Sequence, residues 1–62
     1  MESTESIVRK WENNLQELLS RLEEAKSNFH SNPSDLNKEE VRRIEKYIEN
    51  EREDIRELRK SL

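Results

Sequence analysis

Apolar residues recur at alternating intervals of three and four positions in both halves of the chain, and this spacing restricts the possible folds more than any other feature. The first series is Val8, Trp11, Leu15, Leu18, Leu22, Ala25 and Phe29. The second series is Val41, Ile44, Ile48, Glu51, Ile55, Leu58 and Leu62, with one glutamate among the apolar residues. Each is the a/d pattern of a heptad repeat, which predicts a long amphipathic helix.

The segment SNPSDLNKEE, residues 31–40, separates the two series and contains the only proline of the chain. Pro33 cannot continue a helix, and it restricts Asn32 to extended conformations. The first helix is therefore predicted at about residues 4–31, followed by a turn at about residues 32–37.

The start of the second helix is predicted from its capping residues. Asn37 is expected to be the N-cap, and Glu40, three residues later, completes a capping box. Leu36 and Val41 occupy the positions of a hydrophobic staple. The second helix is thus predicted at about residues 38–61.

A turn of this length favours two antiparallel neighbours within one domain, residues 1–62. The predicted fold class is all-α, an antiparallel two-helix hairpin in which facing residues have numbers that sum to about 70. Ile7, Leu19 and Tyr47 flank the a/d seam and make the apolar stripe wider than two helices can cover.

A homodimer that closes into a four-helix bundle is the simplest way to cover the stripe, and a partner amphipathic helix would also serve. The predicted core and interface residues are Val8, Trp11, Leu15, Leu18, Leu19, Leu22, Phe29, Val41, Ile44, Tyr47, Ile48, Ile55 and Leu58.

Glu51 is the only ionisable residue at a d position of either series. A polar residue there can specify register or oligomeric state, at a cost in stability. A long charged side chain can also reach water from such a position and have no specific role. Both interpretations stay open at the level of the sequence.

The sequence offers no residues for catalysis, metal binding or cofactor binding. The chain contains no cysteine, no glycine and a single histidine, His30, which excludes a thiol nucleophile and a glycine-rich phosphate loop. Position 27 is serine, so no Glu-x-x-His motif ends at His30. We expect no enzyme, no metal site and no cofactor.

Charge and hydropathy indicate neither nucleic-acid binding nor membrane insertion. The formal net charge is −3, and residues 38–62 contain eight basic and eight acidic side chains. Spacings such as Glu49–Arg52 and Glu53–Arg56 predict ordinary ion pairs on the helix surface. No apolar run approaches the roughly 20 residues of a membrane span, so the chain is expected to be soluble.

The chain as a whole resembles designed helical hairpins and bundles. The resemblance lies in the sustained heptads, the single tryptophan, the lack of glycine and cysteine, and a loop that combines proline with a cap and a staple. It implies a function of folding and associating. The core Glu51 and His30 depart from the pattern of a strict design.

Residues 32–62 also resemble the last helix of the N-terminal regulatory domain in syntaxin 6-type SNAREs. The resemblance is carried by Asn37, Glu40, Val41, Tyr47, Arg52, Ile55, Arg56, Leu58 and Lys60. It implies a fragment of a protein-binding module. In architecture alone, the hairpin is similar to the plasmid regulator Rop, a dimeric four-helix bundle that binds RNA.

Overall fold

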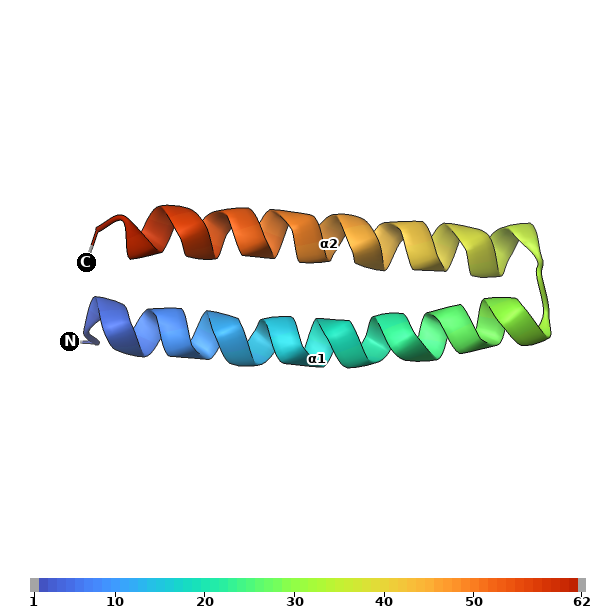
Figure 1. The fold of residues 1–62 in the computed structure, drawn as a ribbon, viewed down its shortest axis with the longest axis horizontal. Coiled ribbons are helices and arrows are strands. Elements are labelled where there is room, and N and C mark those ends of the chain that lie inside the picture. The colour runs from blue at the N-terminus through green and yellow to red at the C-terminus, as the bar shows by residue number, and fades with distance from the viewer. Residues whose placement is uncertain (1, 62) are drawn as a thin grey trace.

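The computed structural model describes residues 2–61, which form a hairpin of two helices (Figure 1). Helix α1 spans Thr4–Ser31 and helix α2 spans Asp35–Arg59. The helices lie side by side and antiparallel, with both termini at one end and the turn at the other. The molecule is a rod of 45 × 15 × 14 Å. The predicted all-α hairpin is confirmed, and its closure into a four-helix bundle stays a prediction.

Helix α1 begins and ends where local sequence signals place it. The hydroxyl of Ser3, the N-cap, accepts a hydrogen bond of 3.1 Å from the backbone N–H of Ser6. At the other end Asn32 is extended, with φ −142° and ψ 90°, as expected for a residue that precedes proline.

Helix α2 begins three residues earlier than the sequence analysis predicted, and its N-cap is Ser34 instead of Asn37. The Ser34 hydroxyl accepts a hydrogen bond of 3.2 Å from the backbone N–H of Asn37. Serine is as good an N-cap as asparagine, and Asp35 adds a favourable negative charge in the first turn. The prediction of an N-cap at Asn37 was therefore wrong. The helix also ends at Arg59, two residues before the predicted end.

The predicted capping box and hydrophobic staple are wrong for the same reason. Leu36 now lies inside the first turn of α2 and is 82% exposed, so it does not pack on Val41. Glu40 forms an ion pair of 3.5 Å with Arg43, one turn further along the helix.

Asn37 instead connects the two helices at the turn. Its side-chain Nδ2 donates hydrogen bonds to the carbonyl oxygens of Asn32, at 2.8 Å, and Asn28, at 3.4 Å. Both carbonyls also accept a backbone N–H group: Asn28 accepts from Asn32 at 2.9 Å, and Asn32 accepts from Ser34 at 2.8 Å. The Asn37 amide therefore adds a second donor to each carbonyl and links the start of α2 to the end of α1.

The core is a narrow line of side chains between the helices. Its buried apolar residues are Val8, Ala25, Ile44, Ile48 and Ile55. The other predicted core residues are only half-buried: Trp11, Leu15, Leu18, Leu19, Leu22, Phe29, Val41 and Leu58.

One predicted interface residue, Tyr47, is 56% exposed and lies outside the core of the hairpin.

The register of the two helices is close to the predicted one. Near the open end, Glu12 and Arg59 form an ion pair of 2.9 Å, one position away from the register in which residue numbers sum to about 70. Leu62, the last member of the second heptad series, lies outside the described residues.

Replacing Ser34 with alanine is expected to lower the free energy of unfolding by about 1 kcal/mol, because α2 loses its N-cap. Urea denaturation at one fixed protein concentration measures the change. Ser27→Ala, in the exposed interior of α1, is the matched control and should not destabilise the protein, because alanine is the better helix former. Equal stability of the S34A variant and the parent protein would show that the cap does not contribute.

Replacing Asn37 with aspartate is expected to destabilise the hairpin by about 1 kcal/mol, although an acidic residue suits the first turn of a helix. The carboxylate has no N–H to donate to the carbonyls of Asn32 and Asn28. Asn50→Asp, on the exposed surface of α2, carries the same charge change as a control. If N37D were as stable as the parent protein in urea denaturation, the connection between the helix ends would be unimportant.

Candidate functional site

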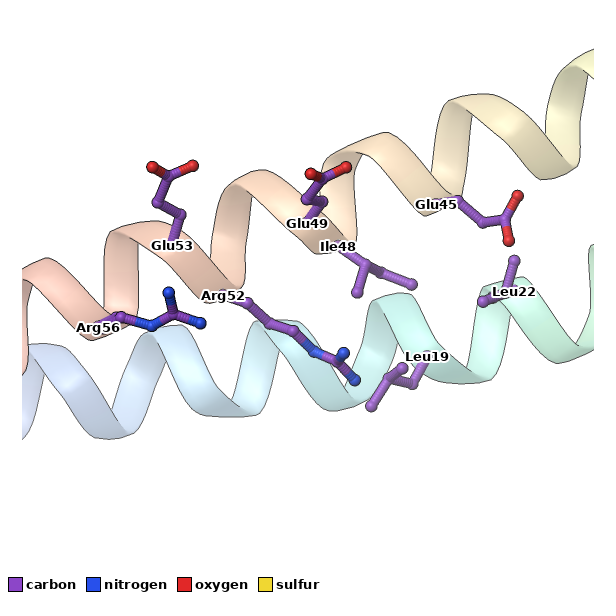
Figure 2. Close-up of a pocket in the computed structure, with 8 residues that line it drawn as sticks. All are labelled: Leu19, Leu22, Glu45, Ile48, Glu49, Arg52, Glu53 and Arg56. Carbon is purple, nitrogen blue, oxygen red and sulfur yellow. The ribbon is translucent and has the colours of Figure 1, made fainter.

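A groove runs between the helices near the middle of the rod (Figure 2). Its volume is about 570 Å³. Ile48 and Leu22 lie between the two helices, Leu19 extends from α1, and charged residues of α2 lie beside them. The lining residues are Leu19, Leu22, Glu45, Ile48, Glu49, Arg52, Glu53 and Arg56.

The heptad positions explain why these residues share one face. Leu22 and Ile48 occupy position a, and Leu19 occupies the adjacent position e. In an antiparallel pair the e positions of the two helices lie beside each other, so the a and e residues of both helices share one face. Ile48 is buried at 5% exposure, whereas Leu19 and Leu22 are half-buried. We call this side of the hairpin the a/e face.

The charged residues around the groove have no ionic partner within the hairpin. Arg52 extends from α2 across the groove toward Leu19 of α1, whereas Glu49 and Glu53 point away from α1 (Figure 2). Among residues 2–61, the ion pairs are Lys10–Glu2, Arg43–Glu40, Arg59–Glu12 and Lys60–Glu57. The surface pairs Glu49–Arg52 and Glu53–Arg56 that the sequence predicted are not formed.

The opposite side of the hairpin, the d/g face, is more polar at its centre. Glu51 is half-buried there, and Tyr47 on the same face is exposed. Leu18 is half-buried on the same face near its middle, and Trp11 and Leu58 line a smaller groove of about 300 Å³ near the open end. The structure leaves both interpretations of Glu51 open.

The ionisable groups of the described residues lie at the surface. Across residues 2–61, all of them are exposed except Glu12 and Glu51, which are half-buried. His30 is exposed in the last turn of α1. Within the same range, no group of three or more histidine or acidic side chains is arranged to hold a metal ion. Neither α1 nor α2, as described, is long and apolar enough to cross a membrane.

The chain matches no protein-family model, and no curated protein and no solved structure is significantly similar to it.

The structure brings together three of the predicted interface residues, Leu19, Leu22 and Ile48, in the central groove. Arg52 and Arg56 were predicted to belong to a solvated helix surface and are exposed, but their place beside this groove was not predicted. Position e in the heptad is the signal that could have indicated Glu45 and Arg52, since it lies next to the seam.

Replacing Glu51 with leucine is expected to raise the free energy of unfolding by about 1 kcal/mol, roughly half the gain of a fully buried leucine. A leucine at this half-buried position would have part of its apolar surface removed from water, and the substitution would also remove a carboxylate from beside the seam. Thermal and urea denaturation at one protein concentration measure the change. Glu17→Leu, on the exposed surface of α1, is the control without burial. Unchanged or lower stability of E51L would show that Glu51 is well solvated or well paired.

Proposed function

We propose that this protein is a non-catalytic helical hairpin that associates with a second copy of itself and serves as a structural or protein–protein interaction module. The proposal rests on the apolar side chains that the hairpin leaves half-covered. Among residues 2–61, five apolar residues are buried, while most of the predicted core is still in contact with solvent. Association would remove this surface from water, which is the dominant favourable term in protein association.

The total solvent-exposed area of the hairpin also supports association. The chain exposes 5263 Å². A folded monomer of 7.6 kDa typically exposes about 4,300 Å², so the hairpin has about 1,000 Å² of additional surface. A standard protein–protein interface buries about 800 Å² on each partner. The additional surface is therefore of the size that one stable interface removes.

The surroundings of the ionisable groups favour association over chemistry. A general acid or base needs a positioned partner and a site from which water is largely excluded. The charged groups around the central groove are exposed and unpaired. They can border an interface, but they do not form a shielded pair of proton donors and acceptors.

The resemblance to designed helical bundles supports an engineered origin as part of the proposal, in which case folding and association are the whole function. A natural helical module that binds a partner helix is the alternative, because the half-buried side chains of the groove would accept an amphipathic helix in the same way.

Sedimentation equilibrium over a wide concentration range, with thermal melts at the same concentrations, tests the proposal. We expect a species of twice 7.6 kDa whose melting temperature rises with protein concentration. A well-folded monomer whose melting temperature does not depend on concentration would contradict self-association.

A further inference from the structure

We propose that the second copy docks on the a/e face, with its turn at the opposite end of the rod, so that each α2 packs antiparallel to the α2 of its partner. This inference rests on the self-association proposed above and specifies the surface and the orientation. Two observations support it: the distribution of apolar residues over the two faces, and the order of the charges along α2.

The a/e face is the better candidate because its apolar residues extend over the length of the hairpin. Leu15, Phe29 and Val41 share heptad position a with Leu22, and all four are half-buried. Leu19 adds a half-buried side chain in the middle. The charged residue nearest the centre of this row is Arg52, which crosses the groove toward Leu19 and is exposed, so the row can pack against an identical one if Arg52 meets an acidic partner there.

The d/g face also carries half-buried apolar residues, Ile7, Trp11, Leu18 and Leu58, but Glu51 interrupts them. Glu51 lies near its middle, where a two-fold axis would bring two copies of the carboxylate close together. Like charges in a desolvated interface are costly. The apolar groove that Trp11 and Leu58 line lies near the open end of the hairpin, away from such an axis.

The charges beside the central groove are arranged so that they complement themselves. Glu45 and Glu49 lie toward the turn, and Arg52 and Arg56 lie toward the C-terminus. A two-fold axis that crosses α2 between residues 50 and 51 places Glu49 opposite Arg52 of the other copy. The same axis places Glu45 opposite Arg56 of the other copy. Each pair occurs twice because the interface is symmetric.

The same two-fold axis also allows α1 to pack against α1 of the other copy. Because facing residues of the two helices have numbers that sum to about 70, the axis meets α1 near Leu19. Leu19 then packs against Leu19 of the other copy. Glu12 and Lys26 each lie seven positions from Leu19 and also occupy heptad position e. Glu12 of one copy therefore lies opposite Lys26 of the other copy. On α1 the centre of the interface is thus apolar and its flanks carry opposite charges. On α2 the same axis also brings Arg42 opposite Arg59 of the other copy, and Arg59 is already paired with Glu12 within its own hairpin.

The alternative with both turns at the same end is less favourable. It would place α2 against α1 of the other copy, which gives an opposite-charge pair, Glu45 with Lys26, but leaves Arg52 facing Leu19 without an acidic partner. Glu53, the remaining charge beside the groove, occupies the outermost heptad position f and is not required in either arrangement.

Charge reversal on α2 tests the inference. At positions 45, 49, 52 and 56, the E45R/E49R variant carries only arginine and the R52E/R56E variant carries only glutamate. We expect each variant alone to dimerise at least about tenfold more weakly than the parent protein. A 1:1 mixture of the two should form a heterodimer. Sedimentation equilibrium measures association, and circular dichroism shows whether each variant is still helical.

A third variant tests the orientation. The E45R/E49R/R52E/R56E variant reverses all four charges, so antiparallel packing restores every opposite-charge pair, and we expect a homodimer close to parental strength. Mixed with the parent protein it should not form heterodimers, because glutamate would then face glutamate. The E17R/E24R variant, with the same charge change on the exposed outer surface of α1, is the control and should dimerise normally.

The outcomes separate this inference from the proposed function. A monomeric parent protein would overturn both. A parental dimer that survives both double reversals would leave self-association standing and overturn docking on the a/e face. Rescue by mixing the double variants, together with heterodimers between the fourfold variant and the parent protein, would support the face and overturn the antiparallel orientation.

Discussion

The width of the apolar stripe on each helix is the constraint on which the rest of the structure depends. Two packed helices touch along one side only, so they bury the residues on that line and leave their neighbours partly in water. In this hairpin Val8, Ala25, Ile44, Ile48 and Ile55 are buried, and the flanking members of the heptads are not. Only 29% of the chain is hydrophobic, so little apolar surface remains for a larger intramolecular core.

Contacts at the two ends of the rod hold the register in which the stripes meet. At the turn, Asn37 bonds the last carbonyl groups of α1, and at the open end Arg59 pairs with Glu12 at 2.9 Å. An exposed ion pair contributes little to stability, so its main effect is on alignment. Between the two ends, Ala25, Ile44 and Ile48 form a cluster that a shift by one turn would break.

A functional interpretation follows from the combination of an incomplete core with an ordered set of unpaired charges. The half-buried leucines of the central groove would gain from a second surface, while the charges beside it would determine which surface binds and in what direction. Apolar burial of this kind supplies affinity, and charge order supplies specificity. The proposed module therefore uses the same heptad pattern twice, first to form the hairpin and then to present its remaining apolar face.

The sequence by itself determined the two helices, the end of α1 before Pro33 and the approximate register, because helix periodicity and the restrictions of proline are local properties. Only the tertiary structure decided where α2 begins. Ser34 and Asn37 are both good N-caps, and the carbonyl groups at the end of α1 engage the Asn37 amide. Tertiary structure also decided that Tyr47 stays exposed, because burial depends on which neighbours the facing helix supplies. Arg52 extends across the groove toward Leu19 of α1 and does not pair with Glu49 of its own helix, although helix spacing alone would predict that ion pair.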